Sequence, residues 1–421
     1  LHASSRLKRR RVCPGIFITV VKLPNELGDM VMSSSKIENV LVLQGGGSLG
    51  AFACGVFKAL TNNNIKIDIV AGTSIGGINA AIIAGSVDKE HPQRTLEEFW
   101  LELAENSVNM ANPVLEWLYD KSRVGLVRAA ENLLPTTDEV NSLLSTISSV
   151  LYGNDKFFVP RWGADYSLKD PQYFNPSKWT YIYDHSPLVK TLEKYIDYNK
   201  LQPNGNPHAR LIMTAVNILT SEPLIFDSSR QKITPKHILA TSGYPSDNFP
   251  WIELEEGVYA WDGALLSNTP FSEVIDASPV IDKRLFFVEN YPRRVDNLPD
   301  NLAEVYHRTR DIQFSDKSQQ QIKMSKVITR YLKYIDELYQ IIDKNIDAAR
   351  IEKKQLEKIR RTYIKMKREH GAEIKNIIHI TRDEPFPRYY ENTDFSVETI
   401  RNSIKDGESK TNQILEKNII K

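Results

Sequence analysis

The sequence contains little cysteine, no long apolar run and almost no net charge. Only Cys13 and Cys54 occur among the 421 residues, which excludes a disulfide framework and favours a reducing compartment, the cytoplasm by default. No apolar run approaches the roughly 20 residues that a membrane-spanning helix needs. The formal net charge is +1, whereas nucleic-acid binding usually shows as a strong basic excess. We therefore expect a cytoplasmic globular protein without a nucleic-acid partner.

Residues 1–35 are interpreted as a disordered leader, or as coding sequence upstream of the true start. A basic run over residues 6–11 and an apolar run over residues 16–21 imitate a signal peptide only faintly. The apolar run has about six residues, and no small-residue cleavage site follows it.

From residue 38 onwards the pattern alternates between strands and helices. Residues 40–43 are continuously apolar, as in a strand buried on both faces of a parallel sheet. A glycine-rich loop and a helix over residues 51–60 follow. A second apolar strand over residues 67–71 leads to another glycine-containing turn and a helix over residues 77–84. This βαβα unit predicts an α/β fold with a mostly parallel central sheet.

The turn after the second strand has the form Gly72-x-Ser74-x-Gly76. This is the pattern of a nucleophile elbow, in which the glycines let strand and helix approach closely and force the serine into a sharp, exposed turn. The same pattern also arises by chance in ordinary glycine-containing loops. Ser74 is therefore a candidate nucleophile, and its surroundings must decide the assignment.

The loop after the first strand, with Gly45, Gly46 and Gly47, has two interpretations. Its glycine spacing formally satisfies the dinucleotide-binding fingerprint. That fingerprint also needs an acidic residue at the end of the second strand, whereas Asp68 stands at the start of that strand. The second interpretation, which we favour, is an anion-binding turn whose backbone N–H groups hold the oxygen of a tetrahedral acyl intermediate.

Asp262 is the candidate partner of Ser74. It ends an aromatic-containing, strand-like run and precedes Gly263. An Asp-Gly pair is usually only a turn former. The order of serine and then aspartate, each delivered by an apolar strand, also suits an aspartate that acts as the base of the serine.

The remaining segments of the sequence carry weaker structural and functional signals. Residues 105–180 collect aromatic side chains, which suits either a satellite core or a lid over an apolar pocket. An apolar 3-4 spacing runs from Ile335 to Met366, with interruptions at Asn345 and Glu352. Residues 301–373 are therefore expected to form a long charged helix or a helical hairpin. Their basic excess suits a solvated face or peripheral membrane contact. Residues 374–421 are expected to form a late strand and a C-terminal helix that return to the core.

Four motifs in this order resemble those of the patatin-like phospholipase family. They lie at residues 45–50 (Gly-Gly-Gly-Ser-Leu-Gly), 72–76 (Gly-Thr-Ser-Ile-Gly), 241–245 (Thr-Ser-Gly-Tyr-Pro) and 262–264 (Asp-Gly-Ala). The resemblance implies a three-layer α/β/α catalytic domain over residues 36–300. The long C-terminal helical insertion resembles a bacterial-type branch of the family.

The resemblance also implies a Ser-Asp dyad that needs no histidine, metal or cofactor. Ser74 would be the nucleophile and Asp262 the base, while the backbone of Gly45, Gly46 and Gly47 would form the oxyanion hole. Gly72, Gly76 and Gly263 would support the turns around the dyad. Many family members have Arg or Lys where this chain has Leu49, so this chain lacks any contribution that the cation makes.

Three functional hypotheses follow. The first is a lipid acyl hydrolase that acts on fatty acyl esters of phospholipids, lysophospholipids or neutral lipids. The second is a Ser-Asp-His esterase of the α/β-hydrolase type, with His307, His370 or His379 as the base. The third is a non-catalytic lipid-binding scaffold in which the basic helical region acts. The exact ester and the oligomeric state stay open.

Overall fold

The computed structural model describes residues 37–119, 145–146, 148–162, 166, 171, 173–315, 317–344, 352–383 and 391–419. The expected leader, residues 1–35, lies outside the described residues. The same holds for much of the segment interpreted as a lid or satellite core, including residues 120–144.

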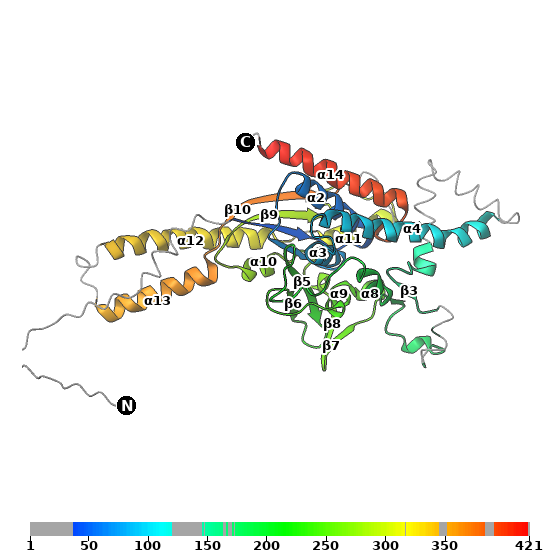
Figure 1. The fold of residues 1–421 in the computed structure, drawn as a ribbon, viewed down its shortest axis with the longest axis horizontal. Coiled ribbons are helices and arrows are strands. Elements are labelled where there is room, and N and C mark those ends of the chain that lie inside the picture. Colours follow the sequence, from blue (N-terminus) through cyan, green and yellow to red (C-terminus); the bar gives the residue numbers. More distant parts are fainter. Residues whose placement is uncertain are drawn as a thin grey trace, which may run out of the picture. The chain divides into compact units, whose positions relative to one another are not determined.

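A mostly parallel sheet forms the centre of the described fold (Figure 1). Its strand order is β10-β9-β1-β2-β5-β8-β7, and β6 pairs with β5. The neighbours from β10 to β5 run parallel, whereas β6, β7 and β8 join by antiparallel pairs. The strands are β1 (Ile37–Leu43), β2 (Ile69–Gly72), β5 (Arg210–Asn217), β6 (Pro223–Asp227), β7 (Ile252–Glu255), β8 (Val258–Asp262), β9 (Asp282–Glu289) and β10 (Ile374–Thr381), and β3 (Val159–Pro160) pairs separately with β4 (Tyr183–Asp184).

Alternate side chains of β1 enter two different cores. Leu41 and Leu43 belong to one hydrophobic cluster, and Val40 and Val42 belong to the other. Since successive side chains of a strand point to opposite faces, the continuous apolar run in the sequence reflects a strand covered on both sides.

Helices cover both faces of the sheet. The first cluster contains residues of α2 (Ala51–Asn62), α3 (Ile75–Gly85), α4 (Pro92–Tyr119), α8 (Pro187–Leu192), α9 (Pro235–Ser242) and α14 (Val397–Ile419). The second contains residues of α10 (Phe271–Ala277) and α12 (Gln319–Lys344). This three-layer α/β/α arrangement confirms the predicted fold class.

Helix α14 packs closely on α2. A Cβ atom on Gly55 of α2 would lie 1.8 Å from the carbonyl oxygen of Ile404, and one on Gly407 of α14 would lie 2.2 Å from that of Phe52. The two backbones touch because glycine occupies both positions. Helix α14 therefore belongs to the same hydrophobic cluster as α2, the helix that follows the glycine loop.

The region over residues 301–373, expected as one long helix or a helical hairpin, contains three described helices. They are α11 (Leu302–Phe314), α12 and α13 (Lys353–His370). The rings of Tyr339 in α12 and Tyr363 in α13 stack with centroids 4.1 Å apart, so these two helices pack together (Figure 1). No helix in the described part of the chain combines the length and apolar character that crossing a membrane requires.

Candidate active site

Ser74 lies at a strained turn between β2 and α3. Its backbone has φ 57° and ψ −132°, a conformation that is rare for a residue with a side chain and fits a nucleophile elbow. A Cβ atom on Gly72 would lie 2.1 Å from the carbonyl oxygen of Gly76, and one on Gly76 would lie 2.3 Å from that of Leu43. Both glycines are therefore required by close backbone approach.

Thr241, at the end of α9, holds the elbow from its other side. The Thr241 hydroxyl donates to the carbonyl oxygen of Thr214 (2.6 Å) and accepts from the backbone N–H of Ser74 (3.3 Å). The side-chain oxygens of Thr73 and Thr214 are also hydrogen-bonded at 2.8 Å. These contacts fix the turn in the conformation that exposes the serine.

Asp262 reaches the elbow because two strands share one edge of β5. Since β6 pairs with residues 212–216 along one edge, β2 and β8 must lie end to end along the other. Gly72 of β2 pairs with Met213, and Asp262 of β8 pairs with Ala215. Two positions along a strand span about 7 Å, so the ends of β2 and β8 meet here.

The carboxyl of Asp262 is buried in surroundings that disfavour its charge. Burial raises its pKa from 3.8 to about 7, although the N–H of Ala264 and the hydroxyl of Ser74 both lower it in part. The Ala264 N–H donates to Oδ1 at 2.8 Å, whereas Oδ2 has no hydrogen-bond partner among the described residues. The Ser74 hydroxyl is thus near the carboxyl without a tight hydrogen bond, as is common in catalytic pairs without substrate.

Gly263 lets the chain turn directly after Asp262. It opens the short helix η4 (Gly263–Leu265). A Cβ atom on Gly263 would lie 2.5 Å from the hydroxyl oxygen of Thr214 and 2.7 Å from its carbonyl oxygen. The Asp-Gly pair therefore forms a turn, and the missing side chain of Gly263 lets this turn pack directly on Thr214 of β5.

The glycine loop lies directly against the elbow. A Cβ atom on Gly45 would stand 2.8 Å from the Cβ atom of Ser74. Gly46 and Gly47 have φ values of 146° and 59°, which glycine adopts without strain. A Cβ atom on Gly47 would also lie 2.2 Å from the carbonyl oxygen of Asn392. The backbone of the C-terminal region therefore packs directly against the loop.

The backbone donors of this loop are not equivalent. The N–H of Gly45 donates to Oδ1 of Asn268 (3.0 Å), so it is already engaged, contrary to the expectation that all three glycines would offer their N–H groups. Within the described residues, the N–H groups of Gly46 and Gly47 have no acceptor. The loop therefore has two N–H groups without a described acceptor, in the two residues that follow Gly45 and lead into η1 (Gly47–Gly50).

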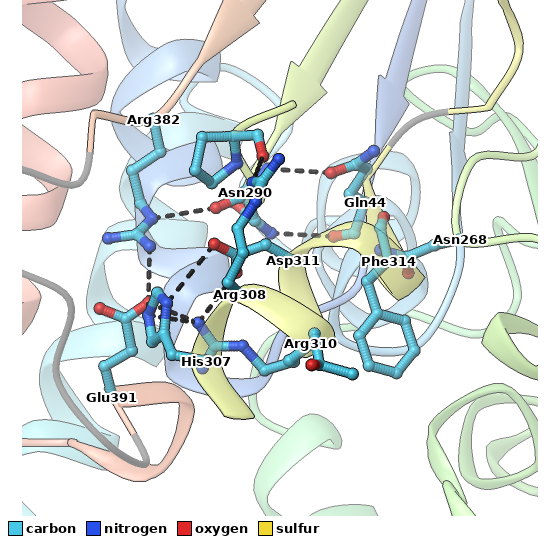
Figure 2. A network of polar contacts seen from close by, with 12 residues as sticks. Gln44, Asn268, Asn290, His307, Arg308, Arg310, Asp311, Phe314, Arg382 and Glu391 are labelled. Atoms are coloured by element: carbon cyan, nitrogen blue, oxygen red, sulfur yellow. Dashed lines mark hydrogen bonds and ion pairs between the residues drawn. The ribbon is translucent and has the colours of Figure 1, made fainter. Parts of the chain in front are cut away.

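Polar side chains from distant segments hold the glycine loop in place (Figure 2). Asn268 links the Gly45 N–H to α11, because its Nδ2 donates to the carbonyl oxygen of Phe314 (3.0 Å). Asn290 donates to the carbonyl oxygens of Gln44 (3.2 Å) and Gly45 (3.0 Å). Gln44 in turn accepts from the backbone N–H of Asn290 (3.0 Å). Gln44 and Asn290 were not among the candidate site residues, although both directly follow apolar strands.

A charged network on α11 stabilises the same region (Figure 2). Glu391, in η5 (Glu391–Thr393), accepts from Arg310 of α11 (3.0 Å) and from Arg382 (2.7 Å). The backbone carbonyl of Glu391 accepts from the hydroxyl of Ser48 (2.8 Å). This network ties α11 and the C-terminal region to the turn that follows the glycine loop.

The three histidines considered as bases have other partners. His307 lies in the α11 network, with Nδ1 3.4 Å from Asp311 and Nε2 3.4 Å from Glu391. Nδ1 of His379 lies 3.0 Å from Glu289. His370 is an exposed residue in the last turn of α13. The described contacts therefore give none of them a position between Ser74 and Asp262.

A cavity of about 1500 Å³ begins at Ser48 and Leu49 and extends beyond the glycine loop. Most of its lining residues are polar or charged, among them Arg293, Arg308 and Asp394, and the lining includes neither Ser74 nor Asp262. Leu49 itself is buried, so its apolar side chain packs into the protein directly after the glycine loop.

A family model described as patatin-like phospholipase matches residues 41–275. The match covers more than half of the chain and includes the glycine loop, the elbow and Asp262. The chain belongs to the patatin-like phospholipase family.

Asp68, the candidate ribose ligand of the nucleotide interpretation, accepts from the backbone N–H of Asn39 (2.9 Å) before β2 begins. It therefore lies at the opposite end of the parallel strands from the glycine loop of this patatin-like chain.

Two relatives illustrate how this chain resembles individual members of the patatin-like family. The chain is 52% identical over 48 residues to lysophospholipase nte1 of Aspergillus terreus, which is 11% of this chain and 3% of that protein. It is 34% identical over 79 residues to the human patatin-like phospholipase domain-containing protein 6. This match covers 19% of this chain and 6% of that protein. The chain thus matches only a small part of the length of these relatives. Among solved structures, VipD from Legionella pneumophila aligns over 91% of this chain and 68% of its own, with 15% identity and a TM-score of 0.36.

Proposed function

We propose that the chain is a serine acyl hydrolase that cleaves fatty acyl esters of lipids through an acyl-enzyme on Ser74. One observation carries the proposal: the strained turn at Ser74 lies next to the buried carboxyl of Asp262 and against the glycine loop, in which two N–H groups have no described acceptor. Membership of the patatin-like phospholipase family supports a lipid ester as the substrate class. Relatives named lysophospholipase point in the same direction.

In the first half-reaction the hydroxyl oxygen of Ser74 attacks the ester carbonyl carbon. Its proton passes to the unpartnered Oδ2 of Asp262. The negative charge that forms on the carbonyl oxygen is held by the N–H groups of Gly46 and Gly47, and each such donor is worth about 3 kcal/mol in comparable sites. The ester C–O bond then breaks, and the leaving alcohol takes the proton from Asp262.

In the second half-reaction water attacks the acyl group on Ser74. Asp262 accepts a proton from the water, and the same two N–H groups hold the oxyanion. The bond between Ser74 and the acyl group breaks, the fatty acid leaves, and the serine oxygen recovers its proton from Asp262. A free aspartate with a pKa near 4 would be a weak base, whereas a pKa of about 7 suits proton transfer at neutral pH.

We further propose that the catalytic unit extends beyond residues 36–300. Strand β10 pairs with β9 along its length, and the carbonyl of Asn392 packs against Gly47. Removing residues 374–421 would therefore expose the back of the glycine loop as well as a strand edge.

The test is hydrolysis of phospholipid, lysophospholipid and triacylglycerol by the purified chain and by its Ser74→Ala and Asp262→Asn variants. Both variants should release no fatty acid above the background while keeping the circular dichroism of the parent. Hydrolysis that survives in either variant would remove that residue from the mechanism. A folded parent that neither hydrolyses any of these lipids nor reacts with a fluorophosphonate would favour the scaffold hypothesis.

A further inference from the structure

Helix α12 turns a broad apolar face towards solvent. Five large apolar side chains along it are exposed by between 37% and 65%: Met324, Ile328, Tyr331, Tyr334 and Leu338. They follow one another at spacings of three or four residues, so they lie on one side of the helix. A helix of a globular protein normally turns such a face inwards.

The opposite side of α12 is the one that packs on the protein. Ile322 belongs to the core beneath the sheet, and Leu332 is also buried. Tyr339 stacks on Tyr363 of α13, and Asp336 lies 3.6 Å from Lys367 of the same helix. The exposed face is therefore not the contact with α13 or with the sheet.

Basic side chains border the exposed face. Lys323, Lys326 and Arg330 are exposed, and the described residues supply none of them with an ion-pair partner. Together α12 and α13 carry 13 Lys or Arg residues against five Asp or Glu residues. A helix with a wide apolar face and a basic border has the pattern of one that lies in the plane of a membrane interface.

We propose that α12 lies flat on an anionic lipid bilayer, with this apolar face at the boundary between headgroups and acyl chains. Lys323, Lys326 and Arg330 then meet the negatively charged headgroups. A second copy of the chain fits less well. At 100° per residue the face spans roughly 120° of the helix, which is wider than the seam of a two-stranded coiled coil. Pairing would also bring together two strongly basic surfaces.

This proposal rests on the proposed function, because a lipid hydrolase must meet its substrate at a lipid surface. Helix α12 starts five residues after Phe314, whose carbonyl oxygen accepts from Asn268, the residue that holds Gly45. Docking of α12 therefore brings the segment that positions the glycine loop to the bilayer.

The test measures co-sedimentation with vesicles of phosphatidylcholine, with or without phosphatidylserine. All proteins carry Ser74→Ala, so that the vesicles are not hydrolysed. Lys323→Gln combined with Arg330→Gln should lower binding to the phosphatidylserine vesicles about 30-fold, since each basic residue near such a surface contributes about 1 kcal/mol. Ile328→Ser combined with Tyr331→Ser should lower binding to both vesicle types by at least about tenfold.

Leu219→Ser is the matched control, because Leu219 is 70% exposed in the turn between β5 and β6 and should be neutral. Unchanged vesicle binding by the Ile328→Ser, Tyr331→Ser protein would overturn the proposal. So would a lipid-free dimer, seen by light scattering, that the same substitutions dissociate, because a second copy would then cover the face.

A soluble short-chain ester separates this proposal from the proposed function. With Ser74 intact, the α12 variants should hydrolyse the soluble ester within about twofold of the parent and lose hydrolysis of vesicle lipid in proportion to binding. If the parent hydrolyses no ester but the vesicle-binding pattern holds, the proposed function fails and the docking surface stands. If ester hydrolysis holds and the binding pattern fails, the docking surface is refuted alone.

Discussion

Replacing Asp262 by Asn should abolish hydrolysis and also make the protein more stable at neutral and alkaline pH. The carboxyl is fully buried, and its pKa of about 7 lies well above its ordinary value of 3.8. A raised pKa means that the folded state binds the proton more tightly than the unfolded state. The carboxyl therefore contributes its full stability below about pH 4 and loses it as the pH rises through about 7.

The size of this effect follows from the two pKa values. A difference of about three units corresponds to about 4 kcal/mol between the protonated and the ionised carboxyl. Asn resembles the protonated form and does not titrate. The variant should thus gain free energy of unfolding over the parent by roughly 2–3 kcal/mol between about pH 5 and pH 8.5.

Urea unfolding of parent and variant at a series of pH values measures this difference. Any constant effect of the amide cancels, because only the change with pH is compared, and other titrating groups are shared by both proteins. A difference in stability that stays constant over this range would show that Asp262 titrates as an ordinary exposed carboxyl. The account of its role as a base at neutral pH would then be wrong.

Three further substitutions test individual contacts. Asn268→Ala should lower kcat for a soluble ester by about 10- to 100-fold, because the Gly45 N–H loses its acceptor and the glycine loop is no longer held in place. Ser267→Ala is the neighbouring control. An unchanged kcat for Asn268→Ala would exclude a positioning role for Asn268. His379→Ala should leave the kcat within about twofold, since Nδ1 contacts Glu289, and loss of activity in a folded variant would revive the Ser-Asp-His hypothesis. Gly55→Val should lower the free energy of unfolding by at least about 2 kcal/mol, because its side chain would collide with the backbone of α14, and a neutral result in urea unfolding would contradict the close contact of α2 and α14.

Much of the fold could be predicted because its signals are local. The apolar runs of β1 and β2 each stand directly before a glycine-rich turn, so strand and turn are read from the same short segment. Burial on both faces leaves a continuous apolar pattern that needs no knowledge of the rest of the chain.

The detailed environment of the site could not be predicted, because it depends on pairing between distant segments. Asp262 approaches the elbow only because β8 runs antiparallel along the part of β5 that β2 leaves unpaired, and no local pattern specifies that register. The N–H of Gly45 is engaged by a hydrogen bond to Asn268, which lies 223 positions later in the sequence. A polar residue after a strand is common, so Gln44 and Asn290 carry no distinguishing signal until their partners are known.

The division of residues 301–373 into three helices was also left open. The expectation of one helix or a hairpin rests only on the apolar 3-4 spacing from Ile335 to Met366, and the sequence contains no proline or glycine between Pro299 and Gly371 to mark a break. Helix α11 is also hard to recognise in the sequence, because its inward-facing side carries the buried polar residues His307 and Asp311. A periodicity argument assigns such residues to solvent.

The most direct test of the central claim is the site and rate of reaction with a fluorophosphonate probe. Peptide mapping of the labelled parent should place one adduct on Ser74, and hydrolysis should fall in proportion to the fraction labelled. The labelling rate should rise with pH around 7 and fall by at least about 100-fold in Asp262→Asn, because the serine then loses its base. An adduct on another residue, or hydrolysis that persists after Ser74 is fully labelled, would contradict the account.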